Sequence, residues 1–144
     1  MHQTQKPGIS ATVESNHTGA ARNDIDALPV SDSWKFKFKA IQKAGGPKLP
    51  YFQQLPLTER MKAYFNILAG LFGPFYYISK GMWKKGLALF GVCLIAVLVL
   101  STILESFGYG FISNSLGYGV GAIYAARANR DYYKKMVLNQ NGWW

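Results

Sequence analysis

The chain has 144 residues and a formal net charge of +9, and 49% of its residues are hydrophobic. This length suffices for about one domain, and the strong basicity indicates an anionic partner, either nucleic acid or a phospholipid surface. Long apolar segments beside the charges favour lipid over nucleic acid, and the single cysteine, Cys93, excludes an intramolecular disulfide.

Residues 1–33 are predicted to form a disordered tail. They are rich in Ser, Thr, Asn, Gly and Ala, contain no aromatic residue and carry a net charge of −2. No periodic apolar face can be drawn through them, so they cannot bury enough surface to fold. His2 and His17 both lie in this tail and receive no ligand or catalytic role.

Residues 34–62 are predicted to form a basic-aromatic cytoplasmic segment with a net charge of +6. Its start, SWKFKFKA, alternates aromatic residues with lysines: Trp34, Lys35, Phe36, Lys37, Phe38 and Lys39. This period of two indicates a short extended segment with aromatics on one face and lysines on the other. Two interpretations stay open. The segment lies on a bilayer with its lysines among the headgroups, or it is a solvated charged stretch whose aromatics pack on the neighbouring domain.

Residues 63–85 are predicted to form an amphipathic interfacial or re-entrant helix and a basic turn. The apolar run, 63–78, has 16 residues. As a helix it would be about 24 Å long, short of the roughly 30 Å hydrocarbon core. It contains Asn66, and Gly73-Pro74 ends or kinks a helix. The residues expected at the membrane interface here are Tyr76, Tyr77, Lys80, Trp83, Lys84 and Lys85, joined by Trp34, Lys35, Lys37 and Lys39 of the preceding segment.

Residues 86–126 are predicted to form two transmembrane helices, over about 86–104 and 107–126. The first has 19 residues without a charge, or roughly 28 Å of helix, which is enough to cross. The second has 20 uncharged residues, five of them glycine. Glycine disfavours a helix in water, but unpaired backbone groups are so costly in lipid that a helix is expected there.

Small residues recur along the second predicted span at helical spacing: Ser106, Gly110, Ser113, Gly117, Gly121 and Ala125. In a continuous helix they would form one stripe, which lets two helix backbones approach closely. The stripe is expected to pack on Gly86 and Gly91 of the first span or on another copy of the chain. The predicted helix-packing residues are Gly110, Ser113, Gly117, Gly121 and Ala125.

The charge distribution predicts the topology, because basic residues that flank membrane segments stay on the cytoplasmic side. If residues 63–78 also crossed, the fourteen basic residues from position 34 onward would divide seven against seven. If only the two later segments cross, all fourteen fall on one side. The sequence therefore predicts a two-span helical hairpin with both termini cytoplasmic. Arg127 and Arg130 lie at the interface, at the start of a basic cytoplasmic tail over 127–144.

Two stretches, YFNILAGLFGPFYYISKGMWKKGL (64–87) and ANRDYYKKMV (128–137), resemble a bacterial membrane family catalogued as domain-of-unknown-function family 2628. The similar features are a Phe-Asn pair, the order Phe-Gly-Pro-Phe-Tyr-Tyr to Met-Trp-Lys-Lys, and Asn-Arg-x-Tyr-Tyr near the end. The resemblance extends from about Trp34 to Leu138. It implies a small protein of the bacterial inner membrane and carries no catalytic residues.

The patterns typical of an enzyme are missing from the sequence. It has no metal-ligand spacing of Cys, His or acids, no phosphate-binding loop, and no histidine outside the tail. We therefore expect no enzyme activity, cofactor or metal. One function class is a membrane adaptor or scaffold whose basic surface binds anionic lipid headgroups or a protein partner. The alternative is a homo-oligomeric pore or transport accessory subunit packed through the glycine stripe. The second span offers few polar groups to line a pore, which favours the adaptor.

Overall fold

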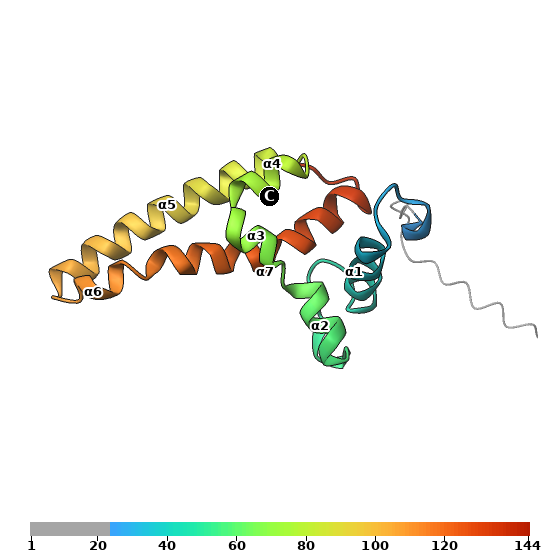
Figure 1. Cartoon of the computed structure of the whole chain (residues 1–144), viewed down its shortest axis with the longest axis horizontal. Helices are drawn as coiled ribbons and strands as arrows, with labels where there is room; N and C mark the ends of the chain where they lie inside the picture. Colours follow the sequence, from blue (N-terminus) through green and yellow to red (C-terminus); the bar gives the residue numbers. More distant parts are fainter. Residues whose placement is uncertain (1–23) are drawn as a thin grey trace, which may run out of the picture.

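The computed structural model describes residues 24–144, so most of the predicted tail, residues 1–23, lies outside the described residues. Over 24–144 every regular element is helical, which confirms the all-α class (Figure 1). Two short 3-10 helices are η1 (Ile25–Ala27) and η2 (Phe52–Gln54). The α-helices are α1 (Asp32–Lys43), α2 (Leu57–Tyr64), α3 (Ile67–Phe72), α4 (Pro74–Ser79), α5 (Trp83–Ser106), α6 (Gly110–Ser113) and α7 (Leu116–Met136).

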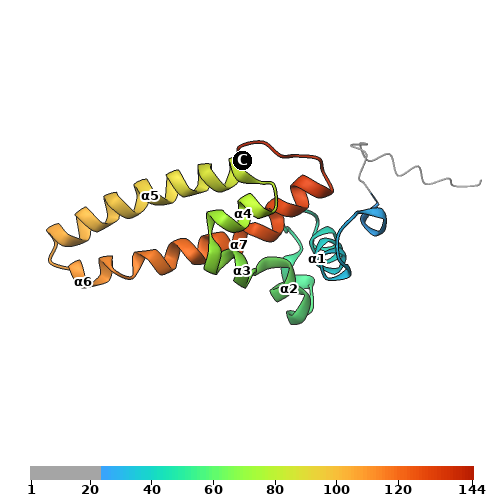
Figure 2. The same cartoon turned by 45° about the horizontal axis from the view of Figure 1, so that its top comes forward.

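Helices α5 and α7 form the two arms of a long hairpin, and α6 lies at its closed end (Figure 1, Figure 2). α5 has 24 residues, which corresponds to about 36 Å and exceeds the hydrocarbon thickness of roughly 30 Å. Large apolar side chains are exposed along it from Leu87 to Ile103. Among the described residues, α5 is the one helix long and apolar enough to cross a membrane.

The second predicted span is not a continuous helix. α6 ends at Ser113, residues 114–115 form a turn, and α7 runs from Leu116 well past 126 to Met136. Residues 113–115 are Ser-Asn-Ser, and these residue types favour turns because their side chains bond to nearby backbone. The predicted continuous helix over 107–126 is therefore wrong, and so is the unbroken small-residue stripe along it.

The open end of the hairpin carries a head made of α1, α2, the loop between them and the last turns of α7 (Figure 1). α1 is a helix, so the extended segment predicted from the alternation at 34–39 is wrong. At helical spacing Trp34, Phe38 and Ile41 share a face, and the two aromatic rings pack on Tyr132 of α7. Phe36 is exposed instead. The interpretation in which aromatics pack on the neighbouring domain is thus confirmed for Trp34 and Phe38.

The described part of the predicted tail is folded onto this head. Ile25 is buried, and Leu28 and Val30 pack against the same core. Asp26 forms an ion pair with Lys39 of α1 at 2.7 Å. The disordered tail predicted for 1–33 is therefore wrong for residues 24–33, because their three apolar side chains find a place in the core.

The apolar run 63–78 is divided twice. Phe65-Asn66 separates α2 from α3 in an extended conformation, and Gly73 separates α3 from α4. Gly73 has φ 49° and ψ −122°, a conformation that needs glycine, and Pro74 then starts the next helix at the position where proline is best tolerated. The predicted bend at Gly73-Pro74 is confirmed, whereas the break at Asn66 was not predicted.

Candidate functional site

Helices α3 and α4, residues 67–79 and hereafter the wedge, pack on both arms of the hairpin. On the α7 side, a Cβ added to Gly121 would lie 2.8 Å from the carbonyl oxygen of Gly70. On the α5 side, a Cβ added to Gly86 would lie 2.7 Å from Cβ of Tyr77. Glycine at 86 and 121 therefore lets the wedge approach both arms closely, as small residues do between membrane helices.

The partner of the small-residue stripe differs from the predicted one. Gly121 and Ala125 contact Gly70 of the wedge. They do not pack on the partners predicted in α5, Gly86 and Gly91. Gly86 meets the wedge, and an added Cβ at Gly91 would have no atom within 4 Å. The prediction that Gly86 and Gly91 oppose the stripe is therefore wrong. The close contacts at Gly86 and Gly121 are instead between the wedge and each of the two arms of the hairpin.

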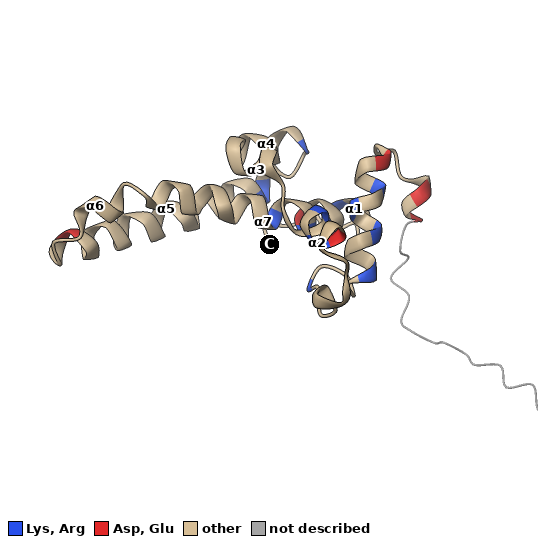
Figure 3. Cartoon of the chain, turned by 60° about the horizontal axis from the view of Figure 1, so that its bottom comes forward, with Lys and Arg blue, Asp and Glu red and all other residues tan. Residues whose placement is uncertain are grey.

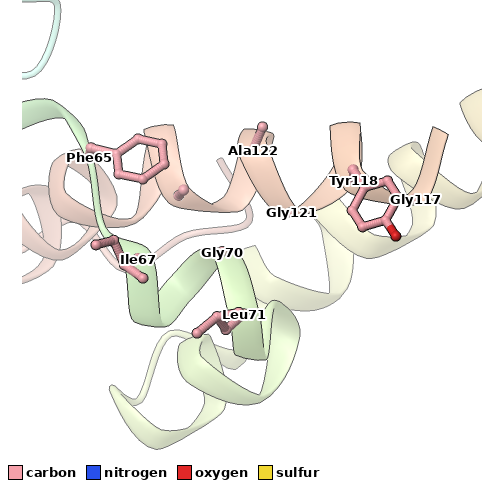
Figure 4. Close-up of a pocket in the computed structure, with 9 residues that line it drawn as sticks. Phe65, Ile67, Gly70, Leu71, Gly117, Tyr118, Gly121 and Ala122 are labelled. Atoms are coloured by element: carbon pink, nitrogen blue, oxygen red, sulfur yellow. The ribbon is translucent and has the colours of Figure 1, made fainter. Parts of the chain in front are cut away.

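The other predicted helix-packing residues do not contact the wedge through close backbone approach. Gly110 and Ser113 belong to α6 at the closed end of the hairpin. An added Cβ at Gly117 would have no atom within 4 Å. Gly117 instead lines a hollow of about 390 Å³ at the crossing of α3 and α7, with Phe65 toward one end and Tyr118 toward the other (Figure 4).

A buried amide, Asn66, holds the unpredicted break in the apolar run. Its Nδ2 donates to Asn129 Oδ1 and to the Tyr76 hydroxyl, both at 2.9 Å. Its Oδ1 accepts the N–H of Ala69 at 3.2 Å, which caps α3. Its backbone N–H donates to the Ala125 carbonyl of α7 at 2.9 Å. Asn66 thus provides a hydrogen-bond partner for a backbone N–H of the wedge and joins the wedge to α7.

Asn129 completes this junction from the α7 side. It is fully buried, and its Nδ2 donates to the carbonyls of Lys62 at 2.9 Å and Phe65 at 3.1 Å. These carbonyls lie where α2 ends, so they lack helical partners. Since a buried polar group without a partner is costly, the asparagine pair stabilises the turn from α2 into the wedge.

A second buried contact joins α4 to α7. The Tyr77 hydroxyl donates to Asp131 Oδ2 at 2.9 Å, and Arg127 Nε lies 3.7 Å from the same oxygen. Burial, and next the Asp131 carboxylate, raise the pKa of Tyr77, so the hydroxyl stays protonated and remains a donor. The hydroxyl and the guanidinium together provide the partners that a buried carboxylate requires.

The structure differs from the predicted membrane interface at three residues. Tyr76 and Tyr77 are buried, because their hydroxyls bond to Asn66 and Asp131. Lys85 is also buried, and its Nζ donates to the Gln140 carbonyl at 2.9 Å. These side chains hold the wedge and the C-terminal segment in place. The prediction that they lie at the surface is wrong.

Two lysines share the ring of Trp34 at the base of the head. Lys37 Nζ lies 4.4 Å and Lys80 Nζ 5.2 Å from the ring centroid. Burial, and next the charge of Lys80, lower the pKa of Lys37. The aromatic ring attracts both cations, so this cluster concentrates positive charge beside the wedge.

The other predicted interface residues remain on the surface of the head or beside it. Lys35 lies 3.8 Å from Asp32, and Lys39 lies 2.7 Å from Asp26, so acidic residues before and at the start of α1 offset part of its charge. The aromatic contacts of the rest are Trp83 on Trp143, Lys84 over Trp83, Arg127 over Trp144 and Arg130 over Tyr64. Figure 3 shows Lys and Arg gathered on the head and on the adjoining part of the hairpin.

Acidic and metal-ligating side chains are dispersed over the described part of the chain. Over residues 24–144, no three His, Cys, Asp or Glu side chains come together as metal ligands. The buried carboxylate of Asp131 is engaged by Tyr77 and Arg127. The arrangement can hold helices together and present a basic surface.

The sequence did not predict the buried hydrogen bonds of Asn66, Asn129 and Asp131. A signal was present, because Phe-Asn, the Tyr-Tyr pair at 76–77 and Asn-Arg-x-Tyr-Tyr are stretches on which the family resemblance rests. The structure brings these stretches together: Asn66 meets Asn129, and Tyr77 meets Asp131. A polar residue that interrupts an apolar run, as Asn66 does, usually has a buried partner, and here that partner is Asn129.

The chain is similar to proteins for which no activity is described. The profile of a family described as "Protein of unknown function (DUF2628)" matches residues 14–137. Two similar proteins are "Uncharacterized protein YigF" of Salmonella typhimurium and the protein of the same name from Salmonella typhi. Each is 26% identical over 122 residues, which covers 79% of this chain and 90% of the relative. No solved structure matches the chain.

Proposed function

Since the chain belongs to the family described as "Protein of unknown function (DUF2628)", we propose a function from its geometry. The protein is an integral membrane adaptor of a bacterial inner membrane. The α5–α7 hairpin anchors it, and the head presents a basic surface in the cytoplasm. The observation that carries this proposal is α5, a helix of 24 residues whose large apolar side chains are exposed and which begins beside the basic head.

The two-span arrangement is supported by the charges of the hairpin. Between Gly86 and Ala126 the sequence contains one charged residue, Glu105, at the closed end of the hairpin. A carboxylate there would lie beside the far aqueous boundary, where its desolvation is avoided. The wedge starts and ends on the head side. Its exposed Leu71, Phe72 and Phe75 suit contact with lipid acyl chains in the cytoplasmic leaflet.

Cysteine labelling of intact cells tests this topology. In a Cys93→Ala background, single cysteines replace Ser79, Gln140 or Phe107. We expect a membrane-impermeant reagent to label position 107 from outside and to reach 79 and 140 only after the membrane is opened. Labelling of position 79 from outside would mean that the wedge crosses, and extraction of the protein by alkaline carbonate would refute the membrane anchor.

The adaptor role is supported by the surface around Phe36. This ring is exposed on α1 with Lys62 Nζ 4.6 Å from its centroid, and it lies among the lysines of α1. An exposed aromatic side chain surrounded by basic residues is typical of binding surfaces. The alternative pore has less support, because Gly121 and Ala125 are occupied by the wedge of the same chain.

Site-specific photocrosslinking tests the adaptor. A photoreactive phenylalanine analogue replaces Phe36 in the full chain, and Phe107 in the control. We expect discrete protein adducts from position 36 that disappear when Lys35, Lys37 and Lys39 are changed to Gln, while membrane insertion persists. The same adducts from position 107, or a ladder of self-adducts alone, would contradict an adaptor.

A further inference from the structure

An apolar groove lies between α5 and α7. Its volume is about 360 Å³, and its walls include Leu89, Cys93 and Ala96 of α5 and Gly119 and Ile123 of α7. On α5 the groove extends from Leu89 to Leu100, or about 16 Å along the helix. The groove therefore has the length and the apolar lining that suit one acyl chain lying along the hairpin.

A basic pocket adjoins the head end of this groove. The pocket has a volume of about 180 Å³ and is lined by Pro47, Arg127, Arg130, Asp131 and Lys134. Arg127 lines the groove as well, so the two hollows share its side chain.

The pocket carries more positive than negative charge. The one carboxylate is engaged by Tyr77 and Arg127, and Lys134 forms no ion pair within the described range 24–144. Three cations thus face one carboxylate that already has partners. A bound anion would balance the excess charge.

We infer that groove and pocket together bind one anionic phospholipid, with an acyl chain between α5 and α7 and its phosphodiester in the basic pocket. Arginine matches phosphate oxygens with two parallel hydrogen bonds. Basic pockets beside transmembrane helices on the cytoplasmic side are the usual sites for anionic headgroups. A zwitterionic lipid would add a cation to a pocket that already has an excess of them. The inference rests on the membrane orientation proposed above.

Native mass spectrometry of the full chain, purified in mild detergent, tests this site. The probes are phosphatidylglycerol and phosphatidylcholine with the same acyl chains. We expect one phosphatidylglycerol to bind in preference to phosphatidylcholine. Lys134→Gln and Arg130→Gln should each weaken phosphatidylglycerol binding about fivefold. Lys48→Gln removes an exposed lysine of the head outside the pocket and should change nothing.

A second pair of variants tests the groove. An added Cβ at Gly119 or at Gly117 has no atom within 4 Å, so neither substitution by Leu should disturb the fold. Gly119 lines the α5–α7 groove, whereas Gly117 lines the hollow beside the wedge. Gly119→Leu should therefore displace the lipid, and Gly117→Leu should retain it.

Three results would overturn the inference. They are equal binding of the two lipids, an equal loss in Lys48→Gln and Lys134→Gln, and displacement of the lipid by inorganic phosphate alone, which would mean that the groove takes no part. These results are independent of the cysteine labelling. Equal lipid binding by a protein that shows the proposed topology would refute the lipid site and leave the membrane anchor standing.

Discussion

Gly121→Leu is expected to separate the wedge from α7 and to cause a large loss of stability. The new Cβ would lie 2.8 Å from the Gly70 carbonyl oxygen, and a backbone atom cannot move aside as a flexible side chain can. Overpacking of this kind costs about 3 kcal/mol. The midpoint of thermal unfolding in mild detergent should fall by roughly 10 °C.

Gly117→Leu is the matched control, one helical turn earlier on α7. The position has open space around it, and replacing glycine by leucine improves helix propensity by about 0.8 kcal/mol or more. The midpoint of thermal unfolding of this variant should therefore stay level or rise slightly. Equal losses of stability in the two variants would mean that α7 needs glycine at both positions for a shared reason. The contact of Gly121 with Gly70 would then not be the cause. No loss in Gly121→Leu would contradict the packing of the wedge on α7.

Asn129→Ala is expected to destabilise the turn from α2 into the wedge. The substitution leaves the carbonyls of Lys62 and Phe65 without side-chain partners and removes an acceptor of Asn66. An unsatisfied buried polar group costs about 1–3 kcal/mol, and three groups lose a partner at once, so we expect a loss of roughly 4 kcal/mol. Hydrogen exchange should accelerate over residues 62–70, which measures the opening at the site itself.

Asn114→Ala is the control, because Asn114 is exposed at the end of α6. It removes the same amide from the same chain and should leave both the unfolding midpoint and the exchange at residues 62–70 unchanged. If exchange in Asn129→Ala rises evenly along the chain, the asparagine pair stabilises the whole fold and has no special role at the turn.

The first arm of the hairpin was predictable because one signal decides it. Over 86–104 the residues are uncharged and include no Pro, Asn or Asp, so length and composition suffice. The second arm depended on two opposed signals, many glycines and no charge. The Ser-Asn-Ser stretch at 113–115 interrupts the helix with a turn at 114–115. Local turn chemistry prevailed there over the average polarity of the segment.

The error at α1 came from a short window. Six residues that alternate perfectly also fit a helix if the face is followed further, since Trp34, Phe38 and Ile41 lie four and three residues apart.

The partner of Gly121 was unpredictable for another reason. A small-residue stripe indicates that a backbone approaches closely, but it does not indicate which backbone. Gly70, 51 positions earlier in the sequence, was as eligible as any glycine of α5.

The asparagine junction also sets an order of events during synthesis. Asn66 and Asn129 are 63 residues apart, so at about 5–20 residues per second the first leaves the ribosome roughly 3–12 s before its partner exists. During that interval the amide has only the nearby Tyr76 hydroxyl, water or backbone to bond with. The wedge can therefore pack on α5 before α7 is made, but its contact with α7 forms only after α7 emerges.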